Sequence, residues 1–526
     1  MAEDISFNNI FHYLEKESIP FDKDEFLFQI QSHPDYPSLL SVADTLNFFK
    51  IPSGAIPVTA SQIEMLPDRF MALLTEATSD TQLYFVDRKG EKYLTVKDKT
   101  TYEIDRETLE SRWQDLVFLV EKPDSGIVST PKSSKTIKAL SFICLVTVLT
   151  GYFMSYNSIS ALGFVLFPII GFLFSIAALK DLFGTKSTFI ASFCKISTST
   201  DCTAVVSSNK WKIFEIVNFS DLSLVFFTSQ LLGLLLLNLS GSFLEFFAIQ
   251  KLILLGSVPV IALSLYYQKF VEKKWCPICL VIADIIGFQI TYLFLLVDTD
   301  TAITSGSLFI YSQVILISTA LWMMLKRILS AQRDLKEAQV KANRLVRNYT
   351  VFKNTLITSP KVEVPDNIGV YLGNIESEAQ ITIITNPFCG HCEEVHETIN
   401  AILEDYGDQL RVKVLFKTSF ELDNEETKEF FRKLMTIYLK NGEQEFKDAL
   451  GDFFKSKDVA LWNQKYQVTS IDEETDTIYA MMNDWTIEQD VNYTPEIYLN
   501  GYKYPGEYER EHLSFYMDEF IEDENF

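Results

Sequence analysis

The chain has 526 residues, of which 46 are Lys or Arg and 70 are Asp or Glu, so its formal net charge is -24. This acidic balance argues against nucleic acid as a partner, because it repels phosphate groups. The length suits several domains, and the hydrophobic fraction of 48% averages an apolar middle, about residues 138–327, with two carboxylate-rich ends.

Residues 1–125 are predicted to form an α+β domain in which helices precede strands. The stretch "HPDYPSLLSVADTLNFF" predicts an amphipathic helix after a turn, and "MLPDRFMALLTE" leads into a strand. The stretch "QLYFVDRKGEKYLTVKDKTTYEI" alternates as a β-hairpin does, with its turn at Lys89-Gly90, and "LESRWQDLVFLVEKP" closes the domain.

This order of elements resembles the papain-like C39 peptidases, which trim leaders from secreted peptides. A cysteine protease needs a thiolate and an activating histidine. Here no cysteine precedes Cys144, and Leu83-Tyr84 stand where the histidine of the family would precede its strand. We expect His12 and His33 to be structural. The resemblance therefore implies a non-catalytic domain that keeps a groove for cysteine-containing peptides, with a peptide transporter as a further partner.

Apolar runs dominate the middle of the chain. A window of about 19 residues predicts six membrane spans, and buried helices of a soluble protein are the alternative. Six apolar runs in series with almost no internal charge favour a polytopic helical bundle over residues 138–327. No basic stretch followed by an apolar one marks a cleaved signal peptide at the N-terminus. The predicted spans are about 138–156, 159–180, 222–240, 248–268, 276–297 and 307–327.

Six of the seven cysteines form three close pairs: Cys194/Cys202, Cys276/Cys279 and Cys389/Cys392. Such clustering indicates thiol exchange or a metal site rather than structural disulfides spread through soluble domains. A four-thiolate zinc site is the alternative, but the two Cys-x-x-Cys pairs lie in different domains, so we expect no metal. Cys144, alone in the first span, is expected to be a small apolar residue.

The third pair has the most specific context. The stretch "AQITIITNPFCGHCEEVHETINAILEDY" predicts a strand, a turn and a helix that opens at Cys389-Gly-His-Cys392. A helix N-terminus favours thiolate at Cys389, and His391 adds to this effect. About a hundred residues later, Thr494-Pro495 precedes a second apolar strand. Together these features resemble the thioredoxin family, which implies that Pro495, in cis, binds substrate beside the disulfide, together with Thr494 and His391.

The two membrane pairs resemble the vitamin K epoxide reductase family, in the bacterial form that is fused to a thioredoxin-like domain. The spacing Cys194-x7-Cys202, Ser208 and Trp275-Cys276-Pro-Ile-Cys279 carry the resemblance. It implies that Cys276 and Cys279 flank a quinone site. Cys279 would attack ubiquinone or menaquinone, Cys276 would exchange with the loop pair, and Ser208 would line or order the site.

A helical linker over residues 328–360 is expected to carry the last span into water, followed by the thioredoxin-like domain over 361–526. Counting spans places all three pairs on one side of the membrane, as sulfur-to-sulfur exchange requires. The lysines near the span ends favour the cytoplasmic side for these thiols. The family resemblance instead implies the periplasmic face of a bacterial inner membrane, and we adopt that orientation.

The expected function is a quinone-dependent thiol:disulfide oxidoreductase. Electrons would pass from peptide or protein dithiols to Cys389/Cys392, then to Cys194/Cys202, then to Cys276/Cys279, and finally to the quinone pool in the lipid. The alternative is a membrane-anchored accessory protein for peptide binding or export, in which the degenerate C39-like domain acts and the thiols are secondary.

Overall fold

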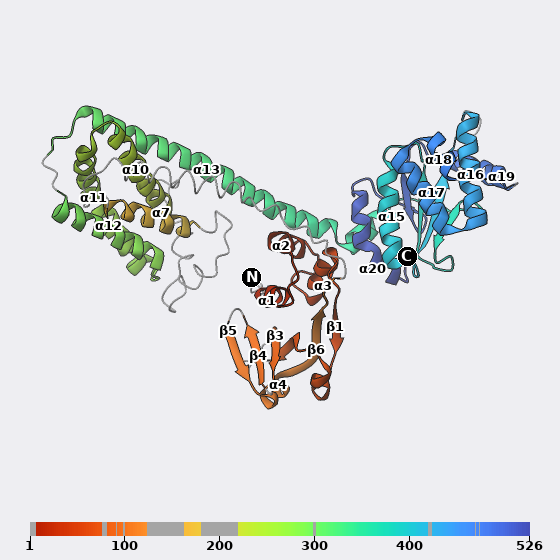
Figure 1. The fold of residues 1–526 in the computed structure, drawn as a ribbon, viewed down its shortest axis with the longest axis horizontal. Helices are drawn as coiled ribbons and strands as arrows, with labels where there is room; N and C mark the ends of the chain where they lie inside the picture. Colours follow the sequence, from red (N-terminus) through yellow and green to blue (C-terminus); the bar gives the residue numbers. More distant parts are fainter. Residues whose placement is uncertain are drawn as a thin grey trace. The chain divides into compact units, whose positions relative to one another are not determined.

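The computed structural model describes residues 7–75, 81–90, 92–97, 100–123, 163–179, 219–297, 301–418, 423–468, 470–472 and 474–526 (Figure 1). The chain divides into two compact units. One comprises residues 1–130 and 339–526, and the other comprises residues 131–338.

The N-terminal domain has the predicted α+β order. The predicted hairpin pairs β3 with β4 in antiparallel register, with Lys89 opposite Lys92. Gly90 has a φ of +66°, in the left-handed region that glycine adopts without strain. The six strands lie in the order β1-β6-β2-β3-β4-β5. The elements are α1 (Asn8–Lys16), α2 (Lys23–Gln31), α3 (Leu39–Phe48), β1 (Ser53–Pro57), η1 (Ala60–Met65), β2 (Arg69–Thr75), β3 (Thr81–Lys89), β4 (Lys92–Lys97), β5 (Thr100–Ile104), α4 (Arg106–Arg112) and β6 (Trp113–Val120).

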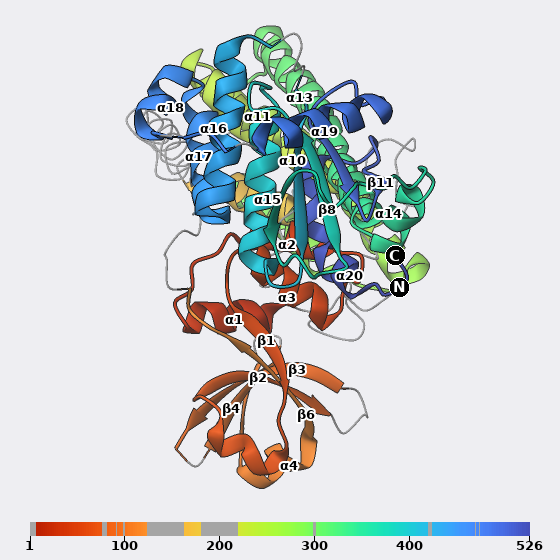
Figure 2. The same ribbon diagram turned by 90° about the vertical axis from the view of Figure 1, so that its right-hand side faces the viewer.

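Figure 2 shows the strands of this sheet as arrows. The sheet buries side chains on both faces. Successive residues of a strand point to opposite faces. On β3, Phe85 packs in the core formed with α1, α2 and α3, whereas its neighbours Tyr84 and Val86 pack in a second core that includes Ile63 of η1 and Leu109 of α4. The strand is therefore apolar on both sides, as its sequence shows.

The middle of the chain forms long apolar helices. Four of them are long and apolar enough to cross a membrane, and they coincide with the last four predicted spans. Within the described residues the second predicted span corresponds to the shorter helix α7, and the first lies outside those residues. The helices are α7 (Leu166–Ala178), α10 (Phe219–Leu239), α11 (Phe243–Tyr266), the π-helix η3 (Tyr267–Val271), α12 (Pro277–Leu296) and α13 (Ser305–Val346).

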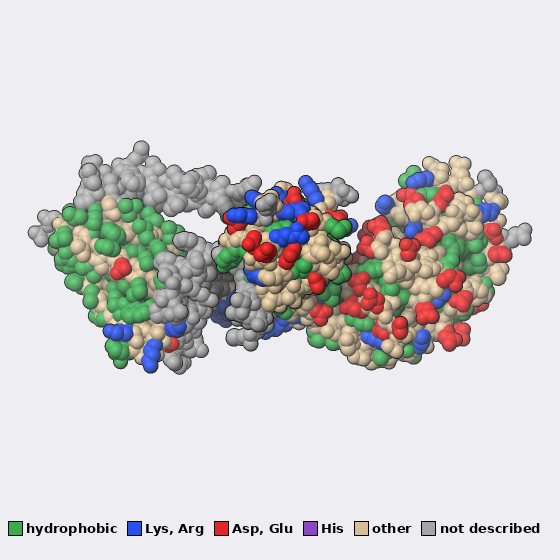
Figure 3. Space-filling model, turned by 90° about the horizontal axis from the view of Figure 1, so that it is seen from below, with side chains coloured by type: hydrophobic (Ala, Val, Ile, Leu, Met, Phe, Trp, Pro, Cys, Tyr) green, Lys and Arg blue, Asp and Glu red, His purple; other side chains and the backbone are tan. Residues whose placement is uncertain are grey.

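Apolar side chains cover the outside of this bundle. Leu252, Phe288 and Leu295 are 62%, 63% and 76% exposed. Figure 3 shows hydrophobic side chains, in green, over the surface of these helices at the left of the view. Exposed apolar surface of this extent needs lipid as its solvent, so the chain is a membrane protein.

Helix α13 continues beyond the apolar span, as predicted. Its 42 residues extend about 63 Å, about twice the thickness of a bilayer core. Near the end of the apolar part, Lys326 forms an ion pair with the buried Asp221 of α10 at 2.5 Å, and the Trp322 indole N–H donates to the same carboxylate at 3.0 Å. These contacts fix α13 to α10 within the bundle.

The C-terminal domain has a sheet of five strands in the order β11-β10-β8-β9-β7. Strands β8 and β9 are parallel, and the other neighbours are antiparallel. Four helices, α16 to α19, lie in sequence between β9 and β10, an insertion that the sequence did not predict. The elements are α14 (Tyr349–Leu356), β7 (Val370–Gly373), β8 (Gln380–Thr385), α15 (Cys392–Tyr406), β9 (Arg411–Phe416), α16 (Glu425–Asn441), α17 (Glu443–Ser456), α18 (Val459–Lys465), α19 (Thr475–Glu488), β10 (Glu496–Leu499), β11 (Tyr502–Lys503), η4 (Arg510–Tyr516) and α20 (Met517–Glu522).

Candidate redox site

Cys389 and Cys392 lie where β8 turns into α15, in the predicted strand–turn–helix arrangement. Strand β8 is buried along most of its length and ends at Thr385, and α15 begins at Cys392. Both cysteines are free thiols. Cys392 is fully buried, whereas Cys389 is partly exposed. The exposed sulfur is therefore the one that a substrate can reach.

The predicted cis proline lies beside this pair. The Thr494–Pro495 peptide bond is cis. The carbonyl oxygen of Thr494 lies 3.3 Å from the Cys389 sulfur, as the acceptor of the thiol hydrogen. The fold thus brings together Cys389, Thr494 and Pro495, three residues that the sequence had assigned to one site.

The two thiols differ in acidity. Partial burial acts to raise the pKa of Cys389, but hydrogen bonds with the His391 backbone, Thr494 and Cys392 outweigh it, so the pKa lies below its ordinary value. Burial is the largest effect on Cys392 and holds its pKa above the ordinary value. The side chain of His391 is exposed. The backbone of His391, the N-cap residue of α15, is one of the groups that lower the pKa of Cys389.

The sequence analysis missed a buried histidine in α15, four residues after Cys392. His396 is 6% exposed, and its Nε2 lies 3.0 Å from the Thr385 hydroxyl at the end of β8. Its ring lies 5.0 Å from that of Phe454. Burial lowers the pKa of His396 to about 4. Its spacing of four residues from Cys392 places both on one face of α15, which was the available signal.

The membrane pair lies at the start of α12, as predicted. Cys276 is the N-cap residue and Pro277 occupies the first helical turn. The Cys276 sulfur accepts a hydrogen bond from the Cys279 N–H at 3.3 Å. Cys276 is fully buried and Cys279 is partly buried, and both are free thiols. The apolar cluster around them includes Phe174, Ala177, Ala178, Tyr267, Ile278 and Ile282.

Gln268 is a further residue of this site that the sequence reasoning missed. Its side-chain oxygen accepts the Cys276 N–H at 2.9 Å, and the residue is 1% exposed in the π-helix η3. π-helical turns occur frequently at functional sites. In the sequence, Gln268 is only a polar residue near the end of an apolar run, and this pattern does not identify Cys276 as its partner.

Buried polar side chains also connect four helices of the bundle. Gln230 of α10 exchanges hydrogen bonds of 3.0 and 3.1 Å with Gln289 of α12, and it donates to Gln250 of α11 at 3.1 Å. Gln250 donates to the hydroxyl of Tyr311 of α13 at 2.7 Å. Interhelical hydrogen bonds of this kind stabilise helix packing in lipid.

Four residues named by the sequence analysis lie outside the described residues. They are Cys144, Cys194, Cys202 and Ser208.

In the N-terminal domain, the two histidines make local contacts. His33 Nε2 lies 2.9 Å from the Asp44 carboxylate, and the His12 ring lies 5.0 Å from that of Phe85. Asn9 at the start of α1 donates to the Leu83 carbonyl oxygen at 2.8 Å. No cysteine precedes Cys144 in the chain, so the thiolate of a cysteine protease is missing here.

Comparison with known proteins gives two family matches. The model of the vitamin K epoxide reductase family matches residues 162–294, and a thioredoxin family model matches residues 366–519. The search of curated proteins gave no match.

Several solved structures are similar to parts of the chain. A periplasmic thioredoxin-like protein from Salmonella enterica has 14% identity and a TM-score of 0.27, and the match covers 31% of this chain and 100% of that one. BdbD from Bacillus subtilis has 12% identity and a TM-score of 0.26 over 31% and 99% of the two chains. The peptidase domain of Streptococcus ComA, a bifunctional ABC transporter, has 9% identity and a TM-score of 0.19 over 21% and 84%.

The family matches and the two described dithiols define the class of protein, a membrane-embedded thiol–disulfide oxidoreductase. In particular, the chain joins a domain of the vitamin K epoxide reductase family to a C-terminal thioredoxin-like domain, behind an N-terminal α+β domain.

Proposed function

We propose that this oxidoreductase transfers electrons from substrate dithiols to a membrane quinone. The observation that carries the proposal is the placement of Cys276 and Cys279 at the first turn of a membrane-spanning helix, in an apolar cluster. Quinones partition into hydrocarbon whereas peptide thiols are in water, so an enzyme that joins them needs a dithiol at the boundary. The family match to the vitamin K epoxide reductases supports this assignment.

The reaction begins at the thioredoxin-like domain. A substrate thiolate attacks the Cys389 sulfur of the oxidised pair, and the Cys389–Cys392 bond breaks with Cys392 as the leaving thiolate. The second substrate thiolate then attacks the substrate sulfur of the mixed disulfide and releases Cys389. The substrate leaves as a disulfide, and the pair retains two electrons. The lowered pKa of Cys389 makes its disulfide more oxidising.

Reoxidation proceeds inward through two further pairs. Cys389 and Cys392 would reduce the Cys194–Cys202 disulfide, and that pair would reduce the Cys276–Cys279 disulfide. Cys279 would then attack the quinone, and the Cys276–Cys279 disulfide would form again, so that its two electrons, with two protons, convert the quinone to the quinol. Ser208 is assigned to the lining or ordering of this site. The quinone, ubiquinone or menaquinone, is the substrate that regenerates the enzyme.

We further propose a membrane orientation and a role for the N-terminal domain. The thiols face the periplasm of a bacterial inner membrane, where a quinone-coupled oxidant is most useful. The N-terminal domain, over residues 1–125, binds cysteine-containing peptides without cleaving them and links the enzyme to a peptide transporter. We assign residues 138–327 to the membrane redox domain, 328–360 to the helical linker and 361–526 to the thioredoxin-like domain.

The test uses purified full-length protein with a reduced dithiol peptide and a soluble quinone. Wild-type protein should form one quinol for each disulfide produced, and Cys279→Ala should abolish quinol formation. Quinone reduction that persists in Cys279→Ala at the wild-type rate would overturn the proposal. An accessory peptide-binding protein would retain its function in cells after Cys→Ala changes in all three pairs.

A further inference from the structure

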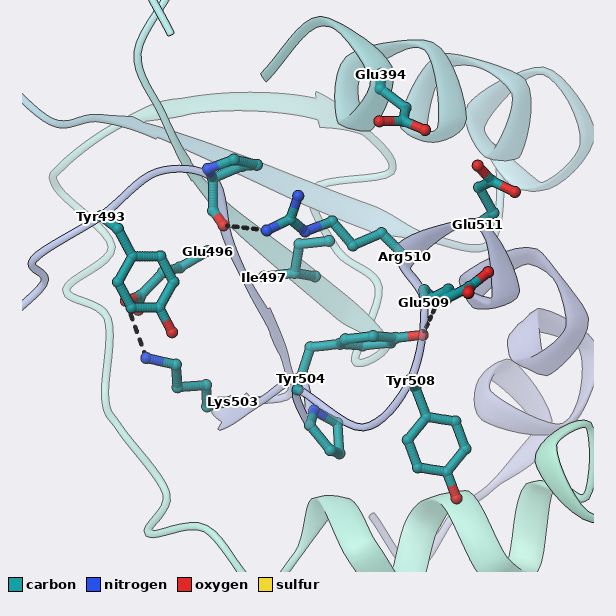
Figure 4. A pocket seen from close by; sticks show the side chains of 13 residues that line it. Glu394, Tyr493, Glu496, Ile497, Lys503, Tyr504, Tyr508, Glu509, Arg510 and Glu511 are labelled. Carbon is teal, nitrogen blue, oxygen red and sulfur yellow. Dashed lines mark hydrogen bonds and ion pairs between the residues drawn. The ribbon is translucent and has the colours of Figure 1, made fainter. Parts of the chain in front are cut away.

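The C-terminal domain has a pocket of about 420 Å³ (Figure 4). Pro495 forms part of its wall, and the preceding residue, Thr494, contacts the Cys389 sulfur. Glu394 enters from the first turn of α15, only two residues after Cys392. A peptide whose cysteine bonds to Cys389 can therefore place an adjoining side chain in this pocket.

The charges that line the pocket are mostly negative. Of its six charged residues, four are glutamates and two are cations. Lys503 already has partners in the pocket wall, because it forms an ion pair with Glu496 at 2.9 Å and lies 4.9 Å from the Tyr493 ring. Its positive charge therefore balances that of Glu496. The second cation is Arg510, whose guanidinium donates to the Pro495 carbonyl oxygen at 3.5 Å.

Three carboxylates remain for a ligand. Glu394, Glu509 and Glu511 form no ion pair with any residue in the part of the chain that the structure describes. All three are exposed to solvent at the pocket. Figure 4 shows Glu394 and Glu511 on the same side of the pocket, from α15 and from η4. These three carboxylates are negative and Arg510 carries one positive charge, so the net charge at the pocket is about two negative units.

Aromatic rings complete the wall. The Tyr504 hydroxyl donates to the Glu509 carbonyl oxygen at 2.8 Å, which fixes the ring at the pocket (Figure 4). Tyr508 lies next to it, with its ring 5.2 Å from that of Phe352. Aromatic faces attract lysine and arginine side chains, and the aliphatic stems of these side chains pack well on such rings.

We propose that this pocket binds a lysine or arginine side chain adjoining the reactive cysteine of the substrate, so that the enzyme prefers thiol peptides with a neighbouring cation. The inference rests on the proposed function and names its substrate class. A glutamate at the same peptide position would face Glu394, Glu509 and Glu511 and be repelled. The pocket thus acts before electron transfer, at the formation of the mixed disulfide with Cys389.

The experiment measures the reduction of the Cys389–Cys392 disulfide in oxidised full-length protein, in detergent and without quinone. Three synthetic peptides differ only in the residue after their single cysteine: arginine, glutamine or glutamate. The readout is the ratio of the mixed-disulfide formation rates with the arginine and glutamate peptides, taken within each variant, so that a general loss of reactivity cancels. Dithiothreitol serves as an uncharged reductant that reports the redox pair alone.

In wild-type protein, the arginine peptide should react about tenfold faster than the glutamate peptide at low salt, and the ratio should fall as salt rises. Glu394→Gln combined with Glu511→Gln should reduce the ratio to about threefold or less. Glu397→Gln, an exposed change on α15 that does not line the pocket, should keep the wild-type ratio.

Equal rates for the three peptides in wild-type protein would overturn the inference, as would a ratio unchanged in the double variant. Failure of dithiothreitol to reduce the Cys389–Cys392 disulfide would instead overturn the proposed function itself. Because no quinone is present, failure of quinone coupling does not affect this result.

Discussion

The Cys389 sulfur lies 3.3 Å from the carbonyl oxygen of Thr494, although 105 residues separate them in the chain. This contact joins the start of α15 to the cis Thr494–Pro495 bond before β10. In the proposed function, a substrate thiol meets the enzyme at this contact.

The difference in acidity between the two C-terminal thiols predicts selective alkylation. In reduced full-length protein at pH 7, Cys389 should react with iodoacetamide about tenfold faster than Cys392. Cys389 is partly exposed and its pKa is lowered, whereas Cys392 is buried and its pKa is raised. The rate at Cys389 should fall as the pH is lowered through its pKa. Peptide mass spectrometry measures both sites, and equal labelling would contradict the assignment of Cys389 as the sulfur that the substrate thiolate attacks.

The contact between Gln268 and Cys276 predicts a role in quinone coupling. Gln268→Leu removes the acceptor of the buried Cys276 N–H, a loss that costs about 1 to 3 kcal/mol and disturbs the first turn of α12. Quinone-dependent thiol oxidation should fall about tenfold, because 1.4 kcal/mol corresponds to a factor of ten. Reduction of Cys389–Cys392 by dithiothreitol should stay unchanged.

The matched control for this change is Lys269→Ala, at the next position, whose side chain is exposed. It should keep the wild-type rate. Equal quinone-dependent rates in Gln268→Leu and Lys269→Ala would show that the contact has no role in catalysis.

The polar cluster of the bundle predicts a loss of stability. Gln289→Leu removes two hydrogen bonds to Gln230, each worth about 0.6 kcal/mol in a membrane bundle. Thermal unfolding in detergent should shift to lower temperature by the equivalent of about 1 kcal/mol. Thr291→Leu, an exposed change two residues further along the same helix, serves as the control. An equal midpoint for the two variants would mean that the cluster does not stabilise the bundle.

The buried His396 predicts acid sensitivity of the C-terminal domain. Its pKa is about 4 in the folded state and 6.5 when unfolded, so the unfolded state binds more protons between these values. Above pH 6.5 the protonation of His396 does not reduce the free energy of unfolding. As the pH falls toward 4, this free energy decreases by at most about 3 kcal/mol. Hydrogen exchange of α15 in full-length protein at pH 7 and at pH 4.5 measures this loss.

His396→Phe should weaken the pH dependence of exchange in α15, because it removes the titrating group. His391→Phe, at an exposed position in the same segment, should retain the wild-type dependence. Identical pH profiles for wild-type protein and His396→Phe would exclude His396 as the source.

Local sequence patterns predicted a large part of the fold. Hydropathy located the helices α10 to α13, because lipid-facing helices are apolar around most of their surface. The strand, turn and helix around Cys389 follow from β-branched residues before the turn and helical periodicity after it. The cis bond at Pro495 came from the family resemblance, since sequence alone does not distinguish the two isomers.

Long-range contacts could not be predicted in this way. Gln268 reaches Cys276 because a π-helix ends α11, and nothing in the residues 267–271 signals this geometry. The cluster of Gln230, Gln250 and Gln289 depends on how three helices are rotated about their axes. The insertion of α16 to α19 has ordinary amphipathic helices, but their place between β9 and β10 is a matter of sheet topology.

The central claim is that electrons leave Cys389 and Cys392 through Cys276 and Cys279 to a quinone. The most direct measurement starts from fully reduced full-length protein, adds a soluble quinone without oxygen, and maps the redox state of each cysteine by differential alkylation and mass spectrometry. In wild-type protein the Cys389/Cys392 pair should become oxidised, whereas in Cys279→Ser it should stay reduced. Oxidation of Cys389/Cys392 in Cys279→Ser at the wild-type rate would contradict the account.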